Sequence, residues 1–83
     1  MMTAAQAREK TLETILQAAK EFLVNSVEPK IDESIRFGSF KCTVKHTHTP
    51  AVRDTVMELL EKEGYSVVAE STYYDIAWED YND

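Results

Sequence analysis

Residues 38–65, GSFKCTVKHTHTPAVRDTVMELLEKEGY, decide the fold of this chain because they predict a strand followed directly by a capped helix. Apolar and polar side chains alternate from Ser39 to His46, and this alternation is typical of a half-buried strand. The side chains expected on the inner face are Phe40, Cys42 and Val44.

The second half of the same stretch predicts a helix from Thr49 to about Glu63. Thr49 is a favoured N-cap residue, and Pro50 suits the first helical position, where no backbone N–H is needed. Gly64 follows at the position where helices often end in a left-handed residue. The inward positions of this helix are Val52, Val56, Leu59 and Leu60, with Met57 on the flank.

Two further strands are expected toward the C-terminus, from Tyr65 to Glu70 and from Tyr74 to Glu79. Both segments are rich in β-branched and aromatic residues. The tripeptide Ser71-Thr72-Tyr73 is the expected turn between them. Ile76 and Trp78 share one face of the last strand.

A long helix is expected before these elements, from about Thr3 to Asn25. Pro29 is expected to kink or break the chain, because proline lacks an N–H and its ring clashes with the preceding turn. A second short helix is predicted from Glu28 to Phe37, closed by Gly38. The apolar stripe of the first helix contains Ala5, Leu12, Ile15, Leu16, Ala19, Phe22 and Leu23.

The sequence therefore predicts one α+β domain, residues 1–83, with a small antiparallel sheet covered by helices on one side. The strands and helices follow the order β-α-β-β after the N-terminal helix. Residues 80–83 are expected to be a frayed acidic tail.

Size and composition favour a self-associating intracellular protein. A chain of 83 residues buries a limited core and has one Cys, so association is a common way of adding stability. A lone Cys is typical of a reducing compartment. Neither a membrane-spanning run nor a signal-peptide pattern is present, so we expect a soluble, cytoplasmic protein without membrane insertion.

The charge distribution argues against nucleic-acid binding. Of the net charge of −6, residues 1–69 contribute −1, from ten acids and nine bases. Residues 70–83 contribute −5, from five acids and no Lys or Arg. Nucleic-acid affinity requires clustered positive charge, which this chain lacks.

The aromatic and acidic C-terminus is the first candidate for a contact surface with a protein partner. Tyr and Trp are enriched at binding hot spots, and interleaved acids favour a basic partner. The alternative is that these aromatics are ordinary strand and core residues. The candidate residues are Tyr73, Tyr74, Trp78, Glu79, Asp80 and Tyr81.

The first helix, residues 1–25, is the candidate surface for homo-oligomerisation, because it is long for so small a domain. Its stripe is wider than a coiled-coil seam, so it also fits simple packing on the domain. Both roles remain open, with one half in the core and the other reaching a partner. The candidate residues are Leu12, Ile15, Leu16, Ala19, Phe22 and Leu23.

No metal, cofactor or catalytic site is predicted. Cys42, His46 and His48 have the same parity along a strand and form a weak alternative zinc set, but paired ligand spacing is absent. The other interpretation makes Cys42 a small buried hydrophobe and places both His in a loop. No nucleophile, metal or phosphate-loop motif appears, so we expect a non-enzyme.

The segments IDESIRFGSFKCTV, EKEGYSVV and YYDIAWED resemble, from about Ile31 to Trp78, small regulatory proteins of tailed bacteriophages. Within that group, length and acidity look like the lysis-inhibition accessory proteins (RIII) of T4-type phages. The resemblance implies a cytosolic co-antiholin in the host cytoplasm, which inhibits or delays lysis by binding the cytoplasmic segment of a phage holin. The alternative is a phage inhibitor of a host enzyme whose acidic surface imitates nucleic acid.

Overall fold

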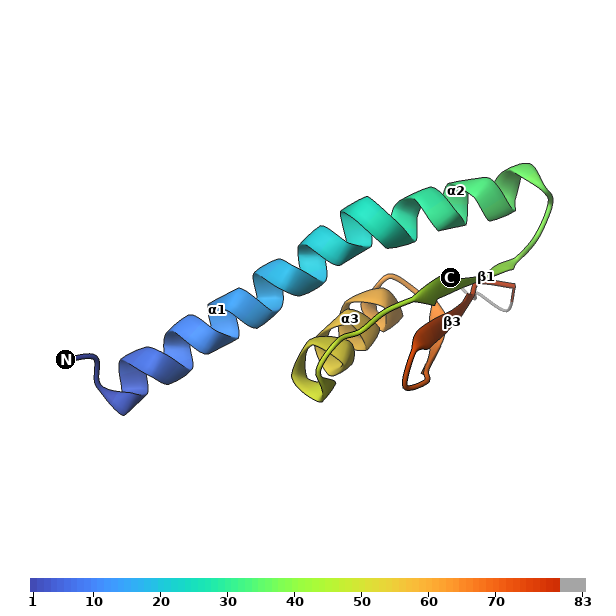
Figure 1. Cartoon of the computed structure of the whole chain (residues 1–83). Helices are drawn as coiled ribbons and strands as arrows, with labels where there is room; N and C mark the ends of the chain where they lie inside the picture. Colours follow the sequence, from blue (N-terminus) through green and yellow to red (C-terminus); the bar gives the residue numbers. More distant parts are fainter. Residues whose placement is uncertain (80–83) are drawn as a thin grey trace.

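The computed structural model describes residues 1–79 and confirms the predicted α+β fold (Figure 1). A long N-terminal helix is followed by a strand, a helix and a hairpin. In chain order the elements are α1 (Ala4–Phe22), the π-helical turn η1 (Leu23–Val27), α2 (Glu28–Arg36), β1 (Lys41–Lys45), α3 (Pro50–Lys62), β2 (Ser66–Ala69) and β3 (Tyr73–Ala77).

The long helix begins at a capping box formed by Thr3 and Gln6. The Gln6 backbone N–H donates to Thr3 Oγ1 at 3.1 Å, and the Thr3 backbone N–H donates to Gln6 Oε1 at 3.0 Å. Two of the helix's orphan donors are thereby satisfied. The first turns of α1 are therefore stabilised locally, without help from the rest of the fold.

The helix does not break at Pro29, because η1 carries the chain from α1 into α2 without interruption. The Glu28 N–H donates to the Leu23 carbonyl, five residues back. Proline in an α-helix clashes with the carbonyl four residues earlier, here that of Asn25, and removes one hydrogen bond. The wider π turn, Leu23–Val27, includes Asn25, so the helix departs from α-helical geometry at the residue with which the proline ring would clash. Of the two outcomes left open by the sequence, the break is therefore wrong.

The π turn also keeps the apolar residues in register. Ala19, Leu23, Val27 and Ile31 lie four residues apart, and such a row drifts about 40° per step around an α-helix of 3.6 residues per turn. The wider turn removes much of this drift. Ala19, Val27 and Ile31 are consequently all buried on the same side of one continuous helix.

Gly38 and Gly64 end α2 and α3 with positive φ angles of 73° and 96°. After α3, the Gly64 N–H donates to the Glu61 carbonyl and the Tyr65 N–H donates to the Leu60 carbonyl. This is the Schellman arrangement, in which the residue after the glycine packs back on the last turn. The cap thereby directs Tyr65 toward Leu60.

The three strands form an antiparallel sheet of order β1-β3-β2, so the last strand lies in the centre. Val44 pairs with Tyr74 across β1 and β3, and Val67 pairs with Ile76 across β2 and β3. Tyr73, expected in the turn, is instead the first residue of β3. Its backbone carbonyl accepts from the Glu70 N–H, which closes the hairpin around residues 70–72.

The core lies between the inner face of the sheet, α3 and the second half of the long helix. Its buried apolar residues are Ala19, Val27, Ile31, Val44, Val56, Leu60, Tyr74 and Ile76. The predicted inward positions Val52, Leu59 and Met57 pack partly buried against this core. Phe40, expected on the inner face, lies outside β1 and is exposed.

The molecule is elongated, with extents of 54 × 26 × 20 Å. Figure 1 shows why: α1 runs well beyond α3 and the sheet, and its N-terminal end stands apart from both. No helix within residues 1–79 is both long and apolar enough to cross a membrane.

Candidate functional site

The predicted C-terminal partner residues that the structure describes, Tyr73, Tyr74, Trp78 and Glu79, do not form one patch. Tyr73 is half-buried at the end of β3, on the face opposite Tyr74. Tyr74 is completely buried, so its side chain belongs to the core and is not available to a partner. Glu79 is exposed, while Asp80 and Tyr81 lie outside the described residues.

Trp78 is the member of this set that lies in a hollow. Its indole ring packs edge-to-face against Tyr65 with ring centroids 6.0 Å apart, and both side chains are half-buried. With Glu63 and Gly64 they line a hollow of about 240 Å³, which we call the Trp78 hollow. Glu63, which lines the hollow, and Glu79, the residue that follows Trp78, are both exposed and add negative charge next to this aromatic pair.

The aromatic side chain of Tyr74 is the centre of a packed polar cluster beneath the sheet. Its ring stacks on His46 with centroids 4.0 Å apart, and Phe22 approaches both Tyr74 and His48 edge-on. Tyr74 Oη lies 2.7 Å from His48 Nδ1. These contacts fasten α1 to the loop after β1.

The hydrogen bonds of His46 define its tautomer. Its Nδ1 accepts from the His48 backbone N–H at 3.1 Å, so the ring proton resides on Nε2. Nε2 lies 2.9 Å from the Glu70 carbonyl and donates to it. Both ring nitrogens are occupied, as expected for a structural histidine that is 6% exposed.

Burial also shifts the pKa values of two side chains in this cluster, Tyr74 and His48. It raises the pKa of Tyr74 to about 12, with Arg53 opposing and Asp54 adding to the shift, so the hydroxyl keeps its proton at neutral pH. Burial, with a smaller contribution from His46, lowers the pKa of His48. A neutral His48 can therefore accept from Tyr74.

The geometry of residues 1–79 does not favour the weak alternative of a metal site at Cys42, His46 and His48. Within residues 1–79 no three His, Cys, Asp or Glu side chains are placed to hold a metal ion. Both His46 nitrogens are already bonded. Burial raises the pKa of the Cys42 thiol, against an opposing effect of Lys30, so the thiolate that a metal requires is disfavoured.

The predicted self-association residues divide into two groups. Ala19 is buried, and Phe22 and Leu23 pack partly buried against the core. Ile15 is half-buried, whereas Leu12 and Leu16 are 49% and 40% exposed. The stripe therefore serves the core at its C-terminal end and faces solvent toward its N-terminal end.

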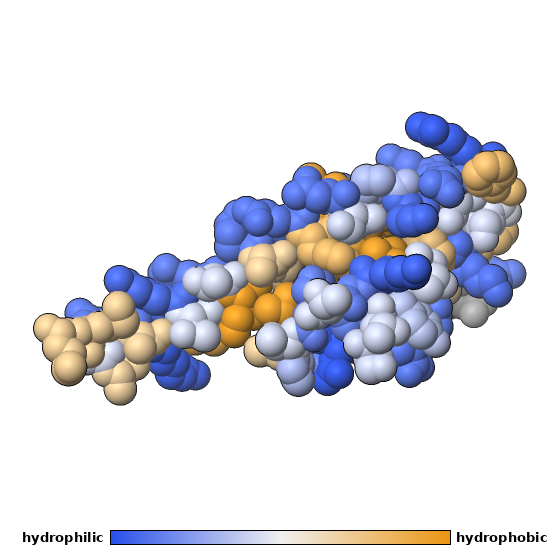
Figure 2. Space-filling model, in the orientation of Figure 1, coloured by the Kyte–Doolittle hydropathy of each residue, from blue (hydrophilic) through white to orange (hydrophobic). Residues whose placement is uncertain are grey.

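Residues 4–14 of α1, which we call the helical arm, are exposed along their whole length. The arm extends past the rest of the molecule, and Figure 2 shows apolar surface at this end. Its length is about 16 Å at 1.5 Å per residue. The exposed Leu12 on an arm that projects past the rest of the molecule makes the arm a candidate contact element.

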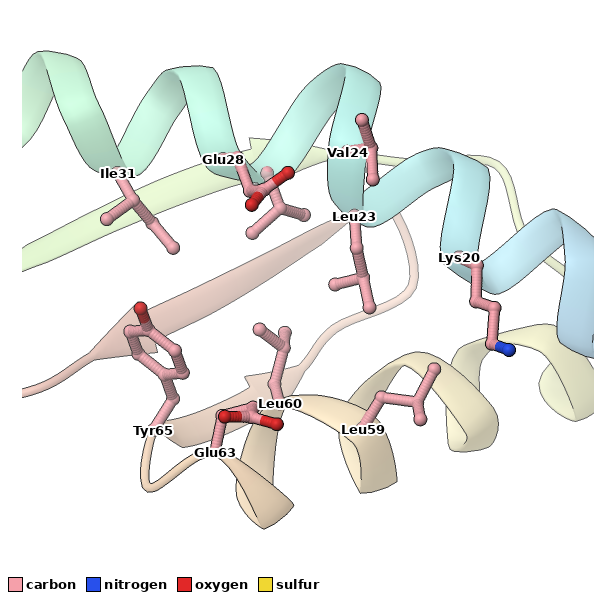
Figure 3. Close-up of a pocket in the computed structure, with 10 residues that line it drawn as sticks. Lys20, Leu23, Val24, Glu28, Ile31, Leu59, Leu60, Glu63 and Tyr65 are labelled. Carbon is pink, nitrogen blue, oxygen red and sulfur yellow. The ribbon is translucent and has the colours of Figure 1, made fainter.

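An apolar groove of about 510 Å³ runs between the long helix and α3, and we call it the interhelix groove (Figure 3). Leu23, Val24, Val27 and Ile31 line it from the long helix. Leu59, Leu60 and Tyr65 line it from α3 and the cap that follows. In Figure 3, Leu23, Leu59 and Leu60 point toward one another across the groove.

The rim of the interhelix groove carries opposite charges at its two ends. Lys20 lies at one end, and Glu28 and Glu63 lie toward the other on opposite walls (Figure 3). All three side chains are exposed. Within residues 1–79 none of them makes an ion pair, so these charges are open to a ligand.

The groove residues were not predicted as a site from the sequence. Val24 and Glu28 are not part of the apolar stripe predicted for the first helix. The π turn aligns them with the other groove residues, and a search for a 3.6-residue period does not detect such a turn. Leu59 was expected in the core; in the structure it is half-buried and also lines the α3 wall of the groove. The detectable signal was the i+4 row of Leu16, Lys20, Val24 and Glu28.

No protein-family model matches the chain, and no curated protein or solved structure proved significantly similar to it.

Proposed function

We propose that this chain is a non-catalytic regulatory protein that acts by binding a basic or amphipathic segment of another protein. The observation that supports this most directly is the Trp78 hollow, where a half-buried Tyr–Trp pair lies beside the Glu63 carboxylate. Tyr and Trp supply large contact area with a polar edge, the combination enriched at binding hot spots.

Charge supports a basic partner. Residues 70–83 carry five acids and no Lys or Arg, and Glu63 adds a carboxylate from the end of α3. The carboxylates at the hollow, Glu63 in its lining and Glu79 directly after Trp78, attract a positively charged segment and increase its association rate more than its affinity. Salt should therefore slow association strongly.

The resemblance to phage lysis-inhibition accessory proteins makes the cytoplasmic segment of a phage holin the first partner to test. In this proposal the chain inhibits or delays lysis in the host cytoplasm by engaging that segment. Of the partner-binding residues expected from the sequence, Trp78 and Glu79 carry this proposal, and Asp80 and Tyr81 lie outside the described residues.

The test is a fluorescence titration with a synthetic peptide of the cytoplasmic N-terminal segment of a T4-type holin. Trp78 is the one tryptophan of the chain, so its emission reports directly on the Trp78 hollow. We expect a saturable change in emission. Glu79→Lys should weaken binding by about 3- to 10-fold at low salt.

Glu9→Lys is the matched control, because it makes the same charge change on the helical arm at the opposite end of the molecule. It should leave peptide affinity within about 2-fold of the wild type. An emission that does not saturate, or equal weakening by both variants, would refute the proposed function.

A further inference from the structure

Strand β2 lies at one edge of the sheet. Among residues 1–79 it has a neighbouring strand on one side only, because β3 occupies the centre. A backbone N–H or C=O at such an edge takes its hydrogen-bond partner from outside the sheet, from water or from another extended segment. The β2 edge is therefore a place where a further strand can be added.

The register shows which backbone groups of β2 are available. The Glu70 N–H donates to the Tyr73 carbonyl, and the bonds between two antiparallel strands involve alternate residues. Val68, two residues before Glu70, is therefore also bonded to β3. Val67 and Ala69 direct their N–H and C=O groups away from β3, so the edge presents two donors and two acceptors.

The opposite edge of the sheet, formed by β1, is protected by charge. Lys41 and Lys45 are exposed at its two ends, and lysine on an edge strand discourages pairing with another strand. Strand β2 has no charged residue, and its Val68 side chain is 56% exposed. Of the two edges, the β2 edge is therefore the one suited to pairing.

The charges around β2 specify a basic occupant. From Glu58 to Glu79 the chain carries six acids and one base, Lys62. Glu63 lies three residues before β2 and Glu70 directly follows it, and both are exposed. A segment along this edge passes a carboxylate at each end, which attracts basic residues and repels acidic ones.

The Trp78 hollow lies at the N-terminal end of the same edge. Tyr65, which lines the hollow, directly precedes β2, and Trp78 follows the β3 residue that pairs with Ser66. Because side chains alternate between the two faces of a strand, Tyr65 lies on the same face as Val67. A strand added along Val67 therefore continues to the hollow, with a side chain beside it on that face.

We propose that the basic partner segment binds as an extended strand added antiparallel to β2. Its backbone makes four hydrogen bonds, two with Val67 and two with Ala69. An apolar side chain lies beside Val68, and basic side chains lie beside Glu70 at one end and Glu63 at the other. This binding mode rests on the proposed function, because it uses the same basic partner and the same hollow.

Amide hydrogen exchange followed by NMR tests the pairing, with the acetylated and amidated peptide Lys-Thr-Val-Thr-Thr-Lys as the probe. In this register its Val lies opposite Val68. At a peptide concentration about five times the dissociation constant, only about one sixth of the protein is free, so exchange of the Val67 and Ala69 amides should slow about 6-fold. The Thr43 amide, which points outward at the β1 edge, is the control and should change by less than about 2-fold.

Backbone methylation of the peptide gives a matched control, because it removes chosen N–H groups and leaves every side chain in place. Methylation at the second and fourth residues removes the donors to Ala69 and Val67, and should weaken binding by about 10-fold or more. Methylation at the third and fifth residues, whose N–H groups point away from β2, should weaken binding by less than about 3-fold.

A charge reversal tests the choice of a basic occupant. Glu70→Lys should weaken binding of the unmethylated peptide by about 3- to 10-fold at low salt. Glu9→Lys makes the same charge change on the helical arm and should leave the affinity within about 2-fold of the wild type.

Four results would overturn the strand addition: no binding of the unmethylated peptide at about 10 mM, equal slowing at Val67, Ala69 and Thr43, equal weakening by the two methylation patterns, or equal weakening by the two charge reversals. None of them refutes the proposed function, because a holin segment can contact the Trp78 hollow in another conformation. Binding of the strand peptide without binding of the holin peptide would instead exclude the holin as partner and support the β2 edge.

Discussion

At the scale of single residues, the Tyr74 cluster has the largest consequence for stability. Tyr74 is an aromatic residue in the central strand, and the sequence offered it equally as a hot spot or as core. Its pairing with Val44 places it on the covered face of the sheet. There His46, His48 and Phe22 surround it, and this makes it a core residue.

The hydroxyl of Tyr74 should contribute measurably to folding. Tyr74→Phe keeps the ring contacts but removes the partner of His48 Nδ1, so we expect a loss of about 1 kcal/mol in the free energy of unfolding. Urea denaturation measures this loss. Tyr73→Phe, on the other face of β3, should change stability by less than about 0.5 kcal/mol. Equal effects of the two variants would contradict the assigned bond.

His48 should make the fold sensitive to mild acid. Its pKa is lowered in the folded state by burial, so the unfolded chain binds protons first as the pH falls. The stability that neutral His48 contributes is complete above its unfolded pKa of about 6.5. It is lost as the pH falls from that value through the lower folded pKa.

Urea midpoints measured from about pH 7.5 down to about pH 5.5 test this, above the range where carboxylates titrate. We expect the midpoint to fall with pH in the wild type. His48→Gln, which cannot titrate, should show a flatter profile. A wild-type midpoint that stays constant or rises on acidification would contradict the prediction.

At the scale of elements, the π turn decides the shape of the N-terminal half. Deleting the exposed residue Asn25 changes the spacing of Ala19, Leu23, Val27 and Ile31 from 4-4-4 to 4-3-4, which suits an unbroken α-helix. The same deletion places Pro29 inside that helix, where proline costs about 3 kcal/mol.

We therefore expect deletion of Asn25 to destabilise the protein by about 3 kcal/mol, and Pro29→Ala in the same chain to restore stability to within about 1 kcal/mol of the wild type. Denaturant unfolding measures both. Deleting Glu21 is the control, because it rotates Ala19 out of the core and should not be rescued by Pro29→Ala. A tolerated Glu21 deletion would show that the register argument is wrong.

At the scale of the whole molecule, the helical arm gives the chain its elongated outline and a surface with no cover of its own. Binding of a second copy to the native state stabilises that state by mass action. Self-association through the first helix, which we expect from the sequence, therefore predicts that thermal stability depends on protein concentration.

The melting temperature of the wild type should rise by a few degrees when its concentration is increased about 100-fold. Leu12→Ser removes apolar surface from the arm and should abolish the rise while leaving the monomer's stability nearly unchanged. Differential scanning calorimetry at the two concentrations measures the effect. Thr14→Ser on the opposite side should behave as the wild type. A rise retained by Leu12→Ser would exclude the arm as its cause.

The sequence by itself determined the elements whose signals are local. The alternation in residues 39–46 predicted β1, Thr49-Pro50 predicted the start of α3, and Gly38 and Gly64 predicted two helix ends. Each of these depends on backbone geometry and on side chains a few residues apart. The start of the first helix at about Thr3 belongs to the same class, and the structure shows a capping box there.

Tertiary structure decided what depends on distant partners. The order β1-β3-β2 buries Tyr74, because β3 lies centrally and one of its faces is covered. Packing of Val27 and Ile31 on the core selected a π turn at Leu23–Val27 over a break at Pro29. The interhelix groove exists because residues of α3 and of the long helix, more than 25 positions apart, face each other. No local sequence pattern encodes which residues so far apart in the chain will face each other.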